Sequence, residues 1–444
     1  MAKERCSGSD RDFVETGSDS ETPRCTIPPK KSLRAGFMIS YRNVSYRWVI
    51  LSVIFGSQFV LSMAAYGWGP LAPFLKKVMS LNTTEIGMIS STFYLAAAVS
   101  VFPAGVMVDR YGERKGLLTW LGLTGFPLFL LSLIHHDYSF FLIMVAIAGA
   151  GYSISNPVAT KALYSWFDRK VRGTVFGIRQ SAVTVGGAVA GLMLVYISQR
   201  SGPFAALRAV CWMIVAMMVL AFIMYRSPER AEITPPRRGA KDGGAMSSGF
   251  RGFFSRPFLA LCMVVAMLGL VQGVVVTFFL LYINEGLGYS VFAAGSCFTV
   301  FMVSGAGGRI LWGIISDLLF EGNRKPVLLI ISLTAIVSVV ILALWSSAWP
   351  HWLFIPVIIG IGISSWGWNA ITFLFVAEMS DRTKTASSVG LATAFGWLGM
   401  SLGPVVFGSL TDRFGYFYAW MSLAVFCIFS LLVCLLLPGS VTRT

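Results

Sequence analysis

Twelve apolar segments, each long enough to cross a lipid bilayer, constrain the fold of this 444-residue chain more than any other feature. A helix that spans the hydrocarbon core needs about 20 mostly apolar residues. The expected spans cover residues 48–75, 86–107, 117–134, 139–164, 173–198, 205–225, 258–284, 291–316, 327–347, 352–378, 388–410 and 416–438. Charged residues make up only 12% of the chain, whereas a soluble domain carries about 25%. The sequence therefore predicts an all-α, multi-pass membrane protein and excludes an ordinary soluble enzyme.

The 35 Lys and Arg residues are distributed unevenly between the two sides of these spans. Twelve spans place both termini on one side, where 27 of the cations lie, against five on the other side. Because cytoplasmic loops carry the excess of Lys and Arg, we expect both termini to be cytoplasmic in a plasma or inner membrane. The formal net charge of +15 therefore reflects topology, and nucleic acid is not an expected partner.

A basic stretch, residues 226–257, is the only long loop between the expected spans and divides them six and six. Contact of this linker with anionic lipid is expected from its charge. The resulting boundaries predict a disordered cytoplasmic tail (1–46), an N-terminal six-helix bundle (47–225), a cytoplasmic linker (226–257), a C-terminal six-helix bundle (258–438) and a cytoplasmic tail (439–444).

The two halves also repeat each other in sequence. Gly105 and Asp109 correspond to Gly313 and Asp317, and further along the halves Asn156 corresponds to the later Asn369. Duplicated six-span halves are typical of transporters that bind a solute between the halves, near the middle of the membrane.

The loop between the second and third spans has the sequence Gly105-Val-Met-Val-Asp109-Arg-Tyr-Gly-Glu113-Arg-Lys115. It resembles the signature G-x-x-x-D-R-x-G-R-[RK]-[RK] of the major facilitator superfamily, with Glu113 in place of Arg. A degenerate copy lies between the eighth and ninth spans. The resemblance covers residues 47–438 and implies two pseudo-symmetric six-helix bundles that expose a central site to each side in turn. Segments 156–180 and 366–378 also resemble those of organic-anion carriers in this superfamily.

The resemblance further implies that charged residues at the cytoplasmic helix ends open and close that side. Asp109 ends the second span, where it can accept hydrogen bonds from a helix N-terminus or a neighbouring Arg. We expect Arg309 to pair with Asp317 or Glu378; the alternative is that these charges serve only topology. The candidate gating residues are Asp109, Arg110, Arg114, Lys115, Arg309, Asp317 and Glu378.

Ionisable side chains inside spans are costly in lipid and are therefore candidates for function. Arg179 lies about two turns into the fifth span, where a guanidinium can bind a carboxylate through two N–H groups. The alternative is an Arg that extends to the membrane interface. No Asp or Glu lies at the centre of a span, which disfavours a cationic substrate and a simple proton relay.

In the family, spans 1, 4, 7 and 10 line the central cavity. Pro157, in span 4, removes a helical hydrogen bond and predicts a bend beside this cavity. The expected substrate-binding residues are Arg179, Asn156, Asn369, Gln272, Gln58, Tyr66 and Trp368.

These patterns together predict a monomeric secondary transporter that moves a small organic anion, such as a carboxylate, by alternating access. Coupling to a proton or to a counter-anion stays open. Two alternatives remain, an exporter of amphipathic compounds, suggested by 34 Phe and 19 Met residues, and a non-transporting sensor of the same fold. Motifs of nucleotide-driven pumps, zinc proteases and serine hydrolases are absent from the sequence. We therefore expect no enzymatic activity, catalytic residue, cofactor or metal site.

Overall fold

The architecture is given by a computed structural model that describes residues 31–134, 137–167, 171–226, 255–346, 349–380 and 385–439. Regular structure within these ranges is entirely helical, with one π-helical turn (η2) and one 3-10 turn (η3). The elements are α1 (Lys31–Tyr66), α2 (Trp68–Val78), α3 (Thr83–Tyr111), α4 (Glu113–Leu133), α5 (Tyr138–Tyr152), α6 (Ser155–Trp166), α7 (Arg172–Ser201), α8 (Pro203–Met224), α10 (Arg256–Leu281), η2 (Tyr282–Gly286), α11 (Val291–Leu318), α12 (Arg324–Leu344), η3 (His351–Leu353), α13 (Phe354–Met379), α14 (Thr385–Phe414) and α15 (Tyr416–Leu435).

The N-terminal tail overlaps the first helix. The sequence predicted disorder over residues 1–46, but α1 begins at Lys31, in a stretch that has no proline and contains good helix formers such as Leu33 and Ala35. Residues 1–30, most of the predicted linker and the last five residues of the C-terminal tail lie outside the described residues. The chain divides into two compact units, Met1–Tyr46 and Arg47–Thr444.

Twelve helical segments are long and apolar enough to cross a membrane, the first being Tyr46–Val78 and the last Tyr416–Leu435. Each of them overlaps one of the twelve expected spans, so this prediction is confirmed. Helices satisfy their own backbone hydrogen bonds, which is why apolar runs of this length take this form in lipid.

Three of the spans are not single α-helices. The first breaks at Gly67, between α1 and α2, where a Cβ atom would lie 2.5 Å from the Met63 carbonyl oxygen. The fourth breaks at Ser153 and Ile154, between α5 and α6, where Pro157 cannot donate a hydrogen bond to the Ser153 carbonyl four residues earlier. The seventh ends in the π-helical turn η2. Spans one, four and seven each contribute to the central cavity described below.

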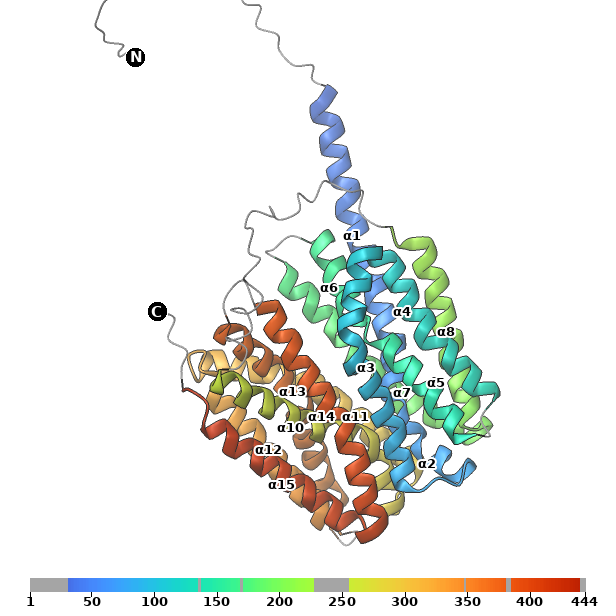
Figure 1. The fold of residues 1–444 in the computed structure, drawn as a ribbon, viewed down its shortest axis with the longest axis vertical. Coiled ribbons are helices and arrows are strands. Elements are labelled where there is room, and N and C mark those ends of the chain that lie inside the picture. The colour runs from blue at the N-terminus through green and yellow to red at the C-terminus, as the bar shows by residue number, and fades with distance from the viewer. Residues whose placement is uncertain are drawn as a thin grey trace, which may run out of the picture. The chain divides into compact units, whose positions relative to one another are not determined.

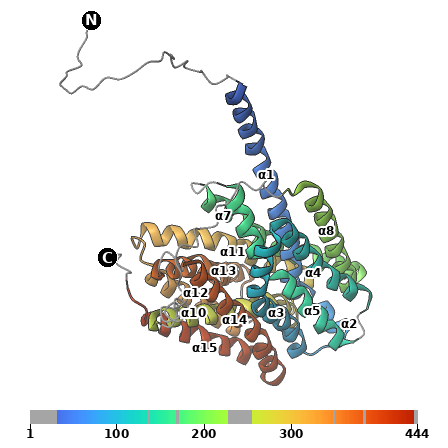
Figure 2. The same cartoon turned by 45° about the horizontal axis from the view of Figure 1, so that its top comes forward.

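The helices of Arg47–Thr444 form two bundles (Figures 1 and 2). Helices α2 to α8 pack on one another together with the membrane part of α1, and α10 to α15 form the second bundle. The face at which α8 ends and α10 begins is called the linker face here. The opposite face, at which α2 ends and α3 begins, is called the far face.

Three turns between consecutive helices use a single glycine. Gly112, Gly202 and Gly415 have φ angles of 86°, 83° and 84°, and each ends one helix and precedes the next. Side chains other than hydrogen are disfavoured in this left-handed region. The glycine of the D-R-x-G signature therefore makes the tight turn between α3 and α4.

Two helix pairs, α3 with α14 and α7 with α11, make the most extensive contacts between the bundles, and α2 also packs on α10. Near the far face a Cβ on Gly87 of α3 would lie 2.3 Å from the carbonyl oxygen of Pro404 in α14. A Cβ on Gly191 of α7 would lie 3.1 Å from the carbonyl oxygen of Gly295 in α11. Small residues let helix backbones approach this closely in a membrane.

The same four helices carry glycines that have open space in the half nearer the linker face. At Gly105, Gly177, Gly313 and Gly390, a Cβ would meet no atom of another described residue within 4 Å. The two helix pairs thus pack closely near the far face, whereas glycines of the same helices lack close described neighbours near the linker face. The conformation is therefore closed toward the far face.

We expect Gly87→Ala to lower the free energy of unfolding by about 1–3 kcal/mol, because the added methyl group would overlap the backbone of α14. Gly307→Ala on α11 is the matched control, since a Cβ there meets no described atom within 4 Å. The control should leave stability unchanged or slightly raised, because Ala favours helix more than Gly does. Thermal unfolding of the purified protein in detergent measures both variants, and equal destabilisation by the two would contradict the close contact of α3 with α14.

Candidate functional site

A small polar cavity lies between the two bundles and is lined by both. Its volume is about 70 Å³, which holds roughly five water molecules and is well below the size of a typical ligand pocket. The lining residues are Gln58, Tyr66, Tyr152, Ser155, Asn156, Arg179, Gln180, Val183, Gln272, Arg309, Trp366, Trp368, Asn369, Phe373, Thr393, Gly396, Trp397 and Met400. All seven expected substrate-binding residues are among them.

Arg179 lines this cavity on the side formed by the N-terminal bundle. Its side chain is only 4% exposed, so it does not extend to the membrane interface. Nη2 donates to Oε1 of Gln58 at 2.6 Å, and Nη1 donates to Oδ1 of Asn156 at 3.0 Å and to Oε1 of Gln180 at 3.2 Å. Amide oxygens from the first, fourth and fifth spans thus hold the guanidinium group, and none of them neutralises its charge.

Arg309 contributes a second cation from the other bundle. Its Nη1 donates to the Gln180 backbone carbonyl and its Nε to the Trp366 carbonyl, both at 3.4 Å. Its guanidinium carbon lies 5.1 Å from the centre of the Trp366 ring, a cation–π distance. Because Gln180 accepts from Arg179 through its side chain and from Arg309 through its backbone, it links the two cations across the bundles.

The expected pairing of Arg309 with Asp317 or Glu378 is wrong. Arg324 takes both carboxylates instead, with Nη1 at 2.6 Å from Asp317 and Nη2 at 3.1 Å from Glu378. The physical reason is position along the helix. Arg309 is eight residues before Asp317 on α11, about 12 Å along the axis, whereas Arg324 begins α12 directly after the turn.

The only charged groups among the described lining residues are the guanidinium groups of Arg179 and Arg309. A guanidinium group has only donors, so Gln58, Asn156 and Gln180 must turn their oxygens toward Arg179, which leaves their NH₂ groups to other partners. Among the described residues, Nε of Arg179 and the indole nitrogens of Trp366 and Trp368 are buried without a hydrogen-bond partner. None of the described residues that line the cavity is Asp or Glu. The cavity therefore suits a group that is rich in acceptors and negatively charged.

Aromatic rings make up much of the remaining wall. Tyr66 and Trp366 meet edge to face across the bundles, with ring centres 5.1 Å apart, and Tyr152 lies 6.5 Å from Trp397. Tyr152 and Trp397 were not among the expected site residues. Trp397 lies on the eleventh span, which the expected cavity lining from spans 1, 4, 7 and 10 left out.

The expected gating charges of the N-terminal bundle make contacts within that bundle. Lys161 donates to the Val108 carbonyl at 2.9 Å and lies 3.5 Å from Asp109, while Arg114 donates to the Phe222 carbonyl at 2.8 Å. Arg110 lies over the neighbouring Tyr111 ring, and Lys115 is exposed. In the C-terminal bundle, Asp317 and Glu378 are joined through Arg324. A gating role across the bundles stays a prediction.

Among the described residues, the contacts that carboxylates make between the bundles lie instead at the far face, where none of the predicted site residues is found. A repeated sequence pattern could have indicated these contacts. Residues 408–415, Gly-Ser-Leu-Thr-Asp-Arg-Phe-Gly, repeat the G-x-x-x-D-R-[YF]-G pattern of residues 105–112 at the far-face end of α14. The aspartate of this second copy is Asp412.

Comparison with known proteins gives a consistent picture. The sequence profile described as "Major Facilitator Superfamily" matches residues 54–378. An uncharacterized MFS-type transporter of Mycobacterium tuberculosis is 26% identical over 411 residues, which cover 90% of this chain and 88% of that protein. The membrane sensor protein UhpC of Salmonella typhimurium is 24% identical and covers 72% and 76% of the two chains. A probable hexose phosphate transport protein of Chlamydia pneumoniae is 23% identical and covers 78% and 80%.

Solved structures agree on the fold. A bacterial homologue of the human lysosomal transporter Spinster, in an inward-facing and unoccupied conformation, superposes with a TM-score of 0.76 at 16% identity. The match covers 88% of this chain and 96% of that structure.

We expect Arg324→Gln to destabilise the C-terminal bundle by about 2 kcal/mol, because it leaves Asp317 and Glu378 without their shared cation. Lys325→Gln is the control on the adjacent residue, since Lys325 donates to the Leu435 and Leu437 carbonyls and forms no ion pair with a described carboxylate. The melting temperature in detergent should fall clearly further for Arg324→Gln. An equal fall for both variants would show that Arg324 does not hold these carboxylates.

Proposed function

Because the chain belongs to the major facilitator superfamily, we propose that it is a secondary transporter that carries a small organic anion between its two bundles by alternating access. The observation that supports this most is the pair of cations in the cavity. Arg179 is buried and Arg309 is partly buried, and each comes from a different bundle. Within the part of the chain that the structure describes, no carboxylate lines the cavity with them.

The charges of Arg179 and Arg309 carry an energetic cost in the membrane that their protein partners do not remove. Charge within a membrane protein is costly unless it is paired. The amide oxygens around Arg179 and the Trp366 ring beside Arg309 solvate the charges but leave the net charge in place. A bound anion would remove that cost, and a guanidinium group can bind a carboxylate or phosphate through two parallel hydrogen bonds.

The position of the cations also fits alternating access. A substrate held by Arg179 of one bundle and Arg309 of the other would bring the two bundles together around it. The relative named as a hexose phosphate transport protein is named for an anionic solute, which supports an anion here as well. Coupling to a proton or a counter-anion, the monomeric state and the cytoplasmic position of both termini stay predictions.

A sensor is the second candidate, because one relative is named as a membrane sensor protein. A sensor of this fold binds its solute without moving it across the membrane. Uptake into proteoliposomes, with and without a pH gradient, separates the two functions and also tests proton coupling.

The test of the anion proposal is a thermal-shift screen of the purified protein with monocarboxylates, hexonates, sugar phosphates, neutral sugars and organic cations. We expect at least one anion to raise the melting temperature, and neutral sugars and cations to have no effect. Arg179→Gln and Arg309→Gln should each weaken binding of that anion about 30-fold or more, from the loss of a charge-assisted hydrogen bond. Arg179→Lys should retain part of the affinity.

Gln58→Glu is the matched variant for this screen. It keeps the shape of the partner that accepts from Arg179 at 2.6 Å but adds a carboxylate. We expect a folded protein that no longer responds to the anion, because Arg179 is already paired. Stabilisation by cations only, or an anion response unchanged in Arg179→Gln and Arg309→Gln, would contradict the proposed function.

A further inference from the structure

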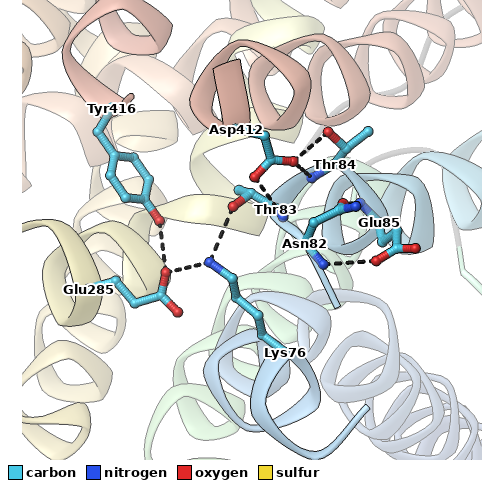
Figure 3. A network of polar contacts seen from close by, with 8 residues as sticks. All are labelled: Lys76, Asn82, Thr83, Thr84, Glu85, Glu285, Asp412 and Tyr416. Carbon is cyan, nitrogen blue, oxygen red and sulfur yellow. Dashed lines mark hydrogen bonds and ion pairs between the residues drawn. The ribbon is translucent and has the colours of Figure 1, made fainter. Parts of the chain in front are cut away.

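The far face is closed by a set of polar contacts between the bundles, shown in Figure 3. Five residues make them and, together with Tyr416, which donates to Glu285 within its own bundle, are called the far-face latch here. They are Lys76, Thr83, Thr84, Glu285, Asp412 and Tyr416.

Asp412 binds the first turn of α3 from the opposite bundle. Its Oδ1 accepts from the backbone N–H of Thr83 at 3.0 Å, and its Oδ2 accepts from the N–H and the hydroxyl of Thr84 at 2.7 and 2.6 Å. The first N–H groups of a helix have no partner within the helix and favour a negative charge. Asp412 at the end of α14 thus caps a helix that belongs to the other half of the protein.

The rest of the α3 cap comes from its own bundle. The Asn82 side chain accepts from Glu85 N–H, and the Glu85 carboxylate accepts from Asn82 N–H, both at 2.8 Å. This capping box holds whichever way the bundles are placed. The N–H groups of Thr83 and Thr84 are the ones that depend on the C-terminal bundle.

An ion pair lies next to this cap. Lys76, at the end of α2, is 2.6 Å from Glu285 and also donates to the Thr83 hydroxyl at 3.2 Å. Glu285 is on the π-helical turn that ends the seventh span, and it accepts from the Tyr416 hydroxyl at 3.4 Å. A π-helical turn is a frequent feature of functional sites.

We propose that the far-face latch, with Asp412 as its central residue, sets the balance between the conformation closed at the far face and the one open there. The contacts join helix ends that must separate for that face to open. They are largely exposed, so water replaces them at modest cost and the closure stays reversible. The inference rests on alternating access and does not depend on which anion is carried.

Hydrogen–deuterium exchange of the full-length protein, without added solute, tests the latch. Asp412→Ala should raise the population open at the far face about tenfold, the effect of losing a good helix cap. Exchange should then rise at the far-face ends of α3, η2 and α14. It should fall at the linker-face ends of α3 and α14, near Gly105 and Gly390, because the bundles close there instead.

Glu85→Ala is the matched control, since it removes a cap of the same helix that comes from its own bundle. It should raise exchange at the start of α3 and leave the linker face unchanged. If Asp412→Ala gives the same local pattern, with no added protection near Gly105 and Gly390, then Asp412 only stabilises α3 and the proposal is overturned.

The ion pair gives a second, independent test. Lys76→Glu and Glu285→Lys should each shift exchange in the same direction as Asp412→Ala, because each places like charges together. The double variant restores an ion pair and should return the pattern toward that of the wild-type protein. Single variants without effect on the linker face would exclude the pair from the latch. Absence of anion binding in the thermal-shift screen would leave these results unaffected.

Discussion

A guanidinium group held inside the membrane without a counter-charge is the interaction on which the central cavity depends. Arg179 is 4% exposed and is surrounded by oxygens of Gln58, Asn156 and Gln180. These amides come from three spans, so the cation fixes how the first, fourth and fifth spans face each other. The same residues that orient the cation must then turn their donors elsewhere, and the Gln58 NH₂ group donates to the hydroxyls of Ser62 and Tyr152.

The fold could be predicted from sequence because it follows from the cost of polar groups in lipid, and the lining of the cavity because the family resemblance implied which spans face it. Apolar runs of about 20 residues can only be membrane helices, and amides such as Gln272 and Asn369 within them need partners. In the structure these two partner each other, with Nδ2 of Asn369 3.2 Å from Oε1 of Gln272. Contacts of this kind depend on helix rotation, which the residue pattern of a largely buried helix does not give.

The partners of long charged side chains could not be predicted from sequence for a related reason. Charge and spacing suggested that Arg309 meets Asp317, but the turn between α11 and α12 places Arg324 there instead. The far-face contacts of Asp412 were not predicted, because the candidate gating residues lie on the face with the excess of Lys and Arg, which is the predicted cytoplasmic face. A single carboxylate that caps a helix of the other bundle has no signature except the repeated G-x-x-x-D-R-[YF]-G pattern.

The glycines at which α3 meets α14 and α7 meets α11 affect how tolerance to substitution should be measured. A protein that alternates between two packings needs small residues at contacts of both, yet one conformation reports on only one set. Gly87 is crowded by α14 in this state, while Gly105 on the same helix has open space. An assay that measures only the amount of folded protein would therefore show that Gly105 tolerates substitution. Selection for solute transport would show that it does not.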